Sequence, residues 1–79
     1  MLDFGERLKI VRKSKELTQK QAAKGLKIAE RSYQRYEGNE STPSFDGFIA
    51  LVDFFDVSAD YLIGRSDDPE RKKQEISHA

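Results

Sequence analysis

The stretch LTQKQAAKGLKIAERSYQRYEGN, residues 17–39, decides the fold. Thr18 and Gln21 have the spacing of a capping box, in which the hydroxyl and the side-chain amide each bind a backbone N–H group at a helix start. Apolar residues at helical spacing follow, and a second amphipathic pattern covers residues 29–37. The connection, residues 27–29, is short. This arrangement predicts a helix-turn-helix.

Another helix is predicted before this stretch, over residues 3–15. Phe4, Leu8 and Val11 recur at i, i+4 and i+7, which is the spacing of one face of an amphipathic helix. Asp3 is its expected N-cap. We expect this helix to serve as scaffold.

Two helices are predicted after the stretch. Ser44 is the expected N-cap of the first, and the core face of that helix should contain Phe45, Phe48, Leu51, Val52 and Phe55. Ser58 is expected to cap a short helix over residues 59–63 that closes the core. Residues 1–64 are therefore expected to form one all-α domain of five helices. Residues 65–79 are polar and contain Pro69, so a tail that is disordered or forms a short helix is expected.

Composition limits the kinds of chemistry available to the chain. It has 79 residues and no cysteine, which excludes disulfides and thiolate metal sites. No run of about eighteen apolar residues is present, and no apolar run follows a basic segment at the N-terminus, so neither membrane insertion nor secretion is expected. His78, the single histidine, is expected to be a solvated tail residue. We therefore expect a small cytoplasmic domain with neither metal nor cofactor.

Charge is divided unequally along the chain. The formal net charge is zero, which by itself argues against a nucleic-acid partner. Residues 1–43, however, contain ten Lys and Arg against six Asp and Glu, a net charge of +4, and residues 44–79 carry −4. The basic half contains the helix-turn-helix, which favours nucleic-acid binding. The alternative is a solvated, highly charged surface without such a partner.

Residues 3–64 resemble the DNA-binding domain of the phage repressor and Cro family of helix-turn-helix regulators. Five blocks match in the family's order: Leu17-Thr18-Gln19, Ala23, Tyr36-Glu37-Gly38, Pro43-Ser44 and Val57-Ser58-Ala59-Asp60-Tyr61-Leu62. The resemblance implies a compact five-helix bundle of the lambda-repressor-like type. In it the helix-turn-helix consists of helix two, which starts at Thr18, and helix three, over residues 29–37. The resemblance also implies a double-stranded DNA operator as the partner.

Several residues depart from this family's pattern. Lys27 stands where Gly is usual, and a non-Gly residue in left-handed geometry there costs about 1 kcal/mol. Gly25, two residues earlier, is expected to shift the bend. Ala29 stands where Ser or Thr usually caps helix three, and it forgoes roughly 1 kcal/mol of capping. Asp56 replaces a usual C-cap Gly, but Asp tolerates left-handed geometry better than most residues.

The resemblance places base-reading positions on the exposed arc of helix three, at Glu30, Arg31 and Arg35, with Gln34 on the same arc. Arg can donate two hydrogen bonds to guanine, Glu can accept one from the cytosine amine, and Gln suits adenine. A half-site that contains G·C pairs is therefore expected. The alternative is a solvated helix face, but Arg31 and Arg35 are one turn apart and would repel each other.

The inner arc of helix three is expected to pack in the core through Tyr33 and Tyr36. Base stacking is the alternative, but stacking uses exposed aromatic residues in open grooves. In similar proteins, the Arg that matches Arg12 forms an ion pair with the Glu that matches Glu37. We expect that pair here, with an ordinary solvated Arg12 as the alternative.

Phosphate contacts are implied at two places. One is the N-terminus of helix two, where free N–H groups favour an anion, and the other is the loop after helix three. The residues concerned are Thr18, Gln19, Lys20, Asn39, Ser41 and Thr42. Glu40 fits this loop poorly because a carboxylate repels phosphate, so moderate affinity is expected.

A dimer contact is implied near the last helix, where relatives make a two-fold contact that spans half-sites one helical turn apart. The residues here are Phe54, Leu62 and Ile63. Scattered surface hydrophobic residues are the alternative, since such residues are normal.

These features favour a sequence-specific transcriptional regulator that binds double-stranded DNA, of the phage or mobile-element repressor type, acting as a homodimer. A protein antirepressor could control it. The alternative is an antitoxin-like protein that binds both its operator and a protein toxin, and a domain that keeps the scaffold but binds only proteins also stays open. An enzyme lacks support, because there is no Cys, one His near the end, and no Gly-rich phosphate loop.

Overall fold

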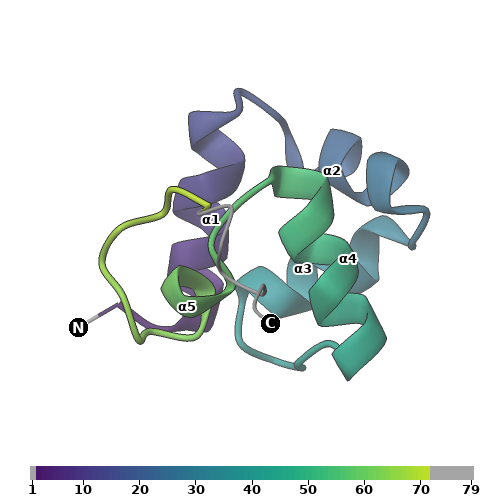
Figure 1. The fold of residues 1–79 in the computed structure, drawn as a ribbon. Coiled ribbons are helices and arrows are strands. Elements are labelled where there is room, and N and C mark those ends of the chain that lie inside the picture. Colours follow the sequence, from purple (N-terminus) through teal and green to yellow (C-terminus); the bar gives the residue numbers. More distant parts are fainter. Residues whose placement is uncertain (1, 72–79) are drawn as a thin grey trace.

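The computed structural model describes residues 2–71. They form five helices, α1 (Phe4–Ser14), α2 (Gln19–Leu26), α3 (Glu30–Glu37), α4 (Phe45–Phe55) and α5 (Ala59–Leu62). α1 packs against α3 and α5, while α2 packs against α3 and α4 (Figure 1). The predicted all-α domain of five helices is therefore confirmed. None of these helices has the length and apolar character needed to cross a membrane.

Side-chain caps set the start of every helix in residues 2–71 except α3. Each cap accepts a hydrogen bond from the backbone N–H three residues later, and the capping residues are Asp3, Thr18, Ser44 and Ser58. Thr18 and Gln21 form the predicted capping box. Ala29, the N-cap of α3, makes no side-chain hydrogen bond, because a methyl group cannot accept one.

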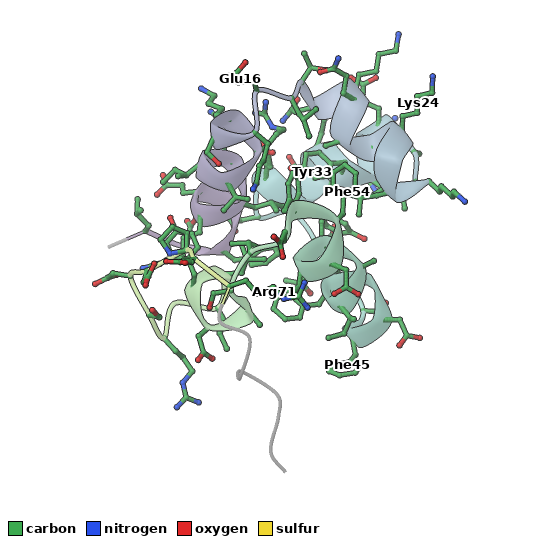
Figure 2. The ribbon with its side chains drawn as sticks, turned by 45° about the horizontal axis from the view of Figure 1, so that its top comes forward. Glu16, Lys24, Tyr33, Phe45, Phe54 and Arg71 are labelled. Atoms are coloured by element: carbon green, nitrogen blue, oxygen red, sulfur yellow. The ribbon has the colours of Figure 1, made fainter. Side chains whose placement is uncertain are left out.

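The core is centred on Tyr33, which Figure 2 shows enclosed between the helices. The largest fully buried side chains are Tyr33, Phe55, Leu8, Leu51 and Leu62. The predicted core face of α4 is wrong at Phe45, which is 77% exposed. Phe45 is the first residue of α4, and Figure 2 places its side chain at the outer tip of that helix. Helical periodicity gives the direction of a side chain, but it does not show whether a neighbour covers it.

Residues 65–71 pack against the helices. The Ser58 N–H donates to the Pro69 carbonyl over 3.0 Å. The sequence predicts a disordered tail or a short helix, and the structure of residues 65–71 differs from both. The reason is that pairing between distant backbone segments leaves no local periodic pattern in a sequence. Residues 72–79, including His78, lie outside the described residues.

Arg7, which the sequence did not single out, holds the start of this segment. It is 5% exposed, and its guanidinium donates to the carbonyls of Leu2, Tyr61 and Ser66. It also donates to the exposed Asp67 carboxylate over 3.3 Å. The guanidinium carbon lies 4.7 Å from the centre of the Tyr61 ring, within the range of a cation–π contact. One buried cation therefore joins Leu2 and the start of residues 65–71 to α5.

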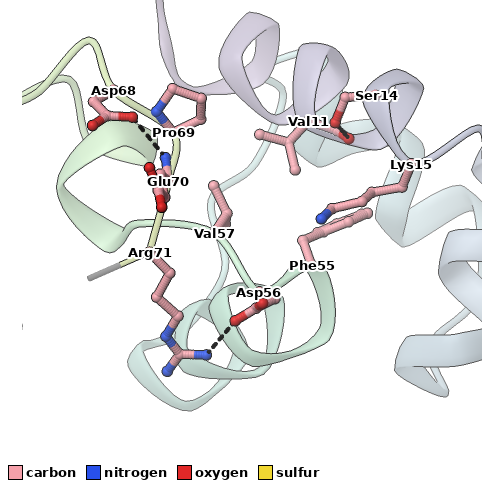
Figure 3. Close-up of a pocket in the computed structure, with 10 residues that line it drawn as sticks. All are labelled: Val11, Ser14, Lys15, Phe55, Asp56, Val57, Asp68, Pro69, Glu70 and Arg71. Atoms are coloured by element: carbon pink, nitrogen blue, oxygen red, sulfur yellow. Dashed lines mark hydrogen bonds and ion pairs between the residues drawn. The ribbon is translucent and has the colours of Figure 1, made fainter. Parts of the chain in front are cut away.

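Arg71 holds the end of the segment. It donates to the carboxylates of Asp53 and Asp56 at 3.0 and 3.5 Å, and Val57 pairs with Glu70 in an antiparallel bridge beside it. The hydrogen bond to Asp53 is the main reason that the Arg71 pKa lies above its ordinary value. A hollow of about 420 Å³ lies between this segment and α1 (Figure 3).

Candidate nucleic-acid interface

The turn between α2 and α3 contains one residue in the left-handed conformation, and that residue is Lys27 where Gly was expected from the family pattern. Lys27 has φ 62° and ψ 41°, and its N–H donates to the carbonyl of Lys24 over 3.1 Å. Gly25 is not part of this turn, because it lies within α2. A Cβ atom on Gly25 would lie only 2.3 Å from the Phe54 ring, so its role is to let α4 approach α2. The expectation that Gly25 shifts the bend is therefore wrong.

The four residues predicted to read bases lie together on α3, and all four are exposed: Glu30, Arg31, Gln34 and Arg35. Gln34 Nε2 donates to Glu30 Oε2 over 3.3 Å. Among residues 2–71, the side chains of Arg31 and Arg35 have no hydrogen-bond or ion-pair partner. Tyr33 is fully buried and Tyr36 is half-buried, so both tyrosines face the core side, as predicted. The exposed face of α3 therefore carries two guanidinium groups that are free to donate.

A buried carboxylate holds α3 from behind. Arg12 Nε donates to Glu37 Oε2 over 2.7 Å, and Arg12 Nη2 donates to Oε1 over 3.1 Å. The Tyr33 hydroxyl donates to Oε2 over 2.6 Å, and Gln19 Nε2 donates to Oε1 over 3.0 Å. Arg12 and Glu37 are 8% and 9% exposed. Arg12 Nη1 also donates to the Leu17 carbonyl. The ion pair that the sequence predicts is thus the centre of a network that joins α1, α2 and α3.

This network fixes the protonation states of its members. Burial raises the pKa of the Glu37 carboxyl, but hydrogen bonds from Arg12, Tyr33 and Gln19 outweigh burial and hold the pKa below its ordinary value. Burial, followed by the hydrogen bond to Glu37, raises the pKa of the Tyr33 hydroxyl. The hydrogen bond to Glu37 raises the pKa of Arg12. The ion pair is therefore charged and the phenol neutral at ordinary pH.

The residues predicted to contact phosphate at the start of α2 differ in exposure. Thr18 and Lys20 are exposed, and the Thr18 hydroxyl caps the helix by accepting from the Gln21 N–H. Gln19 is half-buried and its amide is bound to Glu37. The sequence did not predict this contact, because it joins residues 18 positions apart that share no periodic pattern. Within residues 2–71, the exposed Lys20 side chain makes no hydrogen bond or ion pair.

The loop after α3 brings together the other predicted phosphate residues. Asn39, Ser41 and Thr42 are all exposed, but the side chain of Asn39 has a partner. Its Oδ1 accepts from the Gly5 N–H over 3.0 Å. The backbone N–H groups of Glu40 and Ser41 donate to the Arg35 carbonyl. The loop is therefore tied back to both α1 and α3. Within residues 2–71, no group of three His, Cys, Asp or Glu side chains lies together as a metal ion would require.

The three predicted dimer residues differ in exposure. Leu62 is fully buried, so its prediction as a surface contact is wrong: the short helix α5 directs it into the core. The Phe54 ring packs beside Gly25 of α2, but 38% of Phe54 is exposed. Ile63 is 53% exposed and lies beside a different residue, Phe45, in a hollow of about 380 Å³. The other residues that line this hollow are Phe4, Thr42, Pro43, Ser44 and Phe48.

Residues 5–67 match the model of a family described as helix-turn-helix domains. The chain belongs to this helix-turn-helix family. YobD of Bacillus subtilis strain 168, an uncharacterized HTH-type transcriptional regulator, is 40% identical over 69 residues, which are 87% of this chain and 62% of YobD. The cryptic phage CTXphi transcriptional repressor RstR of Vibrio cholerae is 37% identical over 60 residues, covering 76% of this chain and 54% of RstR.

This helix-turn-helix chain spans between half and two thirds of the length of such curated relatives. Among solved structures, it superposes on the P22 c2 repressor in complex with synthetic operator 9T with a TM-score of 0.77 at 24% identity, covering 84% of this chain and 100% of that one. A transcriptional regulator from Listeria innocua gives a TM-score of 0.70 at 31% identity, covering 78% and 58%. The predicted lambda-repressor-like fold and the resemblance to the phage repressor family are therefore confirmed.

Proposed function

We propose that this helix-turn-helix domain is a sequence-specific transcriptional regulator that binds double-stranded DNA and acts as a repressor. The observation that carries the proposal is the exposed face of α3, on which the guanidinium groups of Arg31 and Arg35 have no partner among residues 2–71. Relatives with the names transcriptional regulator and transcriptional repressor support it. So does the P22 c2 repressor, whose fold is similar and whose structure contains an operator.

In this proposal, α3 enters the major groove and its side chains read base edges. Arg31 and Arg35 each donate to guanine O6 and N7, and each good bidentate contact contributes roughly 1–3 kcal/mol of discrimination. The Glu30 carboxylate, bound by Gln34, accepts from a cytosine amine. A half-site rich in G·C pairs follows from these donors and acceptors.

Contacts to the sugar-phosphate backbone would fix the register of the domain on DNA without reading sequence. The proposed residues are Thr18, Gln19, Lys20, Asn39, Ser41 and Thr42. Lys20 is exposed at the start of α2, where the helix dipole adds to its own charge. Glu40 lies in the same loop, and its exposed carboxylate limits the affinity.

The test selects binding sites from random duplex DNA with the wild-type protein and with two variants. Arg35→Ala is expected to relax the preference at one base pair, at a loss of roughly 1–3 kcal/mol for the best site. Lys20→Ala should weaken binding to all sequences alike and reduce the salt slope by about one. Equal losses from both variants with no change in preference would remove α3 from its proposed role.

We further propose that the regulator binds as a homodimer and that the contact lies around Phe45. This residue is 77% exposed beside Ile63 and a mostly apolar hollow, whereas Leu62 is buried and Phe54 packs beside α2. Phe45→Ser is expected to shift a dimer toward monomer in light scattering, and Phe54→Ser serves as the comparison on the same helix. A wild-type protein that stays monomeric on operator DNA would contradict the dimer.

The same exposed hollow supports a second candidate function, an antitoxin-like protein that binds its own operator and a protein toxin. An antirepressor that docks on this surface is a related partner. In either case, Phe45→Ser would abolish binding of the partner while a monomer still binds a single half-site. The wild-type protein can also be tested against the products of the genes that flank its own gene. If it binds duplex DNA but none of these proteins, a repressor without a protein partner is favoured. The proposed location for all of these functions is the cytoplasm.

A further inference from the structure

The loop that follows α3 contains Asn39, which has a left-handed backbone conformation and a hydrogen-bonded side chain. Asn39 has φ 60°, in the left-handed region that few L-residues adopt. Its Oδ1 accepts from the N–H of Gly5, 34 positions earlier, over 3.0 Å. The Asn39 side chain also helps to hold the pKa of Asp3, the N-cap of α1, below its ordinary value, after the larger effect of the Glu6 N–H. The acceptor of the Asn39 amide is therefore bound to Gly5, and the amide also interacts with the Asp3 carboxylate.

This contact needs a close approach of α1 to the end of α3. A Cβ atom on Gly5 would lie 2.3 Å from the Glu37 carbonyl oxygen and less than 3 Å from the Asn39 side chain. Gly5 is buried at this point. The first turn of α1 and the last turn of α3 therefore meet with no room for a side chain between them.

Asn suits this position for two physical reasons. It tolerates left-handed backbone geometry better than most residues, and its amide supplies one donor and one acceptor side. Gly would satisfy the backbone but would bind neither Gly5 nor Asp3. Asp would accept from Gly5 but would face the Asp3 carboxylate with a like charge.

We propose that Asn39 is a positioning residue for DNA binding. It holds the loop of residues 39–42 on α1, so that Ser41 and Thr42 meet the phosphates at a fixed distance from α3, and its own side chain does not touch DNA. The inference rests on the proposed function. Asn39 then does not contact phosphate itself. It acts indirectly, by anchoring the loop on Asp3 and Gly5 of the neighbouring helix start.

The experiment exploits an exchange that preserves net charge. Asn39→Asp alone places two carboxylates together, and the double variant Asp3→Asn with Asn39→Asp restores one donor and one acceptor. Asn caps a helix about as well as Asp, so α1 keeps its cap. The probe is a duplex selected from a random pool by the wild-type protein, and each affinity is measured where circular dichroism shows the variant to be folded.

We expect Asn39→Asp to weaken binding to all duplexes by about 3- to 10-fold, which corresponds to the free energy of one lost hydrogen bond. The affinity of the double variant should lie within about 2-fold of the wild-type affinity. Asn39→Gly, which keeps the left-handed backbone, should lose about 3- to 10-fold with unchanged base preference. Ser41→Ala, a direct contact, should weaken binding in the wild-type and double-variant backgrounds alike.

Two results would overturn the inference and leave the proposed function intact. If the double variant binds as weakly as Asn39→Asp, the Asn39 amide itself contacts phosphate, because a carboxylate at that position cannot do so. If Asn39→Gly binds as well as wild type, the loop needs no anchor, and this variant decides the question even where Asn39→Asp does not fold. A wild-type protein without affinity for any duplex at low salt would instead refute the proposed function and the inference together.

Discussion

At the scale of single residues, the Glu37 carboxylate links three helices. It accepts four hydrogen bonds from three side chains, Arg12, Tyr33 and Gln19. Glu37→Gln removes the negative charge but keeps the shape, and it leaves the buried Arg12 without its anion. We expect a loss of roughly 3 kcal/mol in the free energy of unfolding, measured with urea. Glu30→Gln, on the exposed face of α3, is the control and should change stability by less than about 0.5 kcal/mol.

The same carboxylate makes stability depend on pH. Its pKa is below the ordinary value in the folded protein, so the unfolded chain takes up a proton at higher pH than the folded one. Its stabilising effect is complete above the unfolded pKa of about 4.3 and is lost as pH falls through the folded pKa. Urea unfolding as a function of pH should show a steeper acid decline for wild type than for Glu37→Gln. Parallel declines would mean that Glu37 does not titrate differently in the two states.

At the scale of helices, the missing cap of α3 offers a test of local stability. Ala29 makes no side-chain hydrogen bond, and Ala29→Ser supplies an acceptor for a free N–H of the first turn. We expect a gain of about 1 kcal/mol in thermal unfolding. Ala50→Ser, in the exposed middle of α4, should give no gain. An unchanged melting temperature for Ala29→Ser would show that another group already satisfies this helix start.

The helices themselves could be predicted from sequence, because their signals are local. Thr18 with Gln21, Ser44 and Ser58 each mark a helix start within a few residues, and each functions as predicted. The Arg12–Glu37 pair was predicted only through resemblance. The contacts of Arg7, Gln19 and Asn39 were not predictable, because each joins positions far apart in sequence by one polar bond without periodicity. The exposure of Phe45 was missed for a related reason: its position on the helix gives its direction, but among residues 2–71 no neighbour covers it.

At the scale of the whole molecule, residues 65–71 are expected to contribute to folding. A chain that ends at Gly64 lacks Ser66 and Asp67, so the buried Arg7 guanidinium loses two of its partners. We expect the free energy of unfolding, measured with urea, to fall by roughly 3 kcal/mol or more, because a buried cation is left without its hydrogen-bond partners. Arg7→Met in the shortened chain should recover part of this loss. A chain that ends at Arg71 keeps both of these partners and is the matched control.

Equal stability of the chains that end at residues 64 and 71 would show that the segment contributes nothing to the fold. A loss that Arg7→Met does not reduce would place the contribution elsewhere, in the backbone pairing of Ser58 with Pro69 or in the Arg71 contacts with α4.

The meeting of three helices on one carboxylate also governs how the molecule comes apart. Helices of eight residues, such as α2 and α3, do not persist alone in water. If either detached, Glu37 would lose hydrogen bonds in a site shielded from solvent, and the remaining pair would be destabilised in turn. Partial melting is therefore unfavourable at every step, and the heat absorbed in a calorimeter should match the enthalpy inferred from the sharpness of the transition.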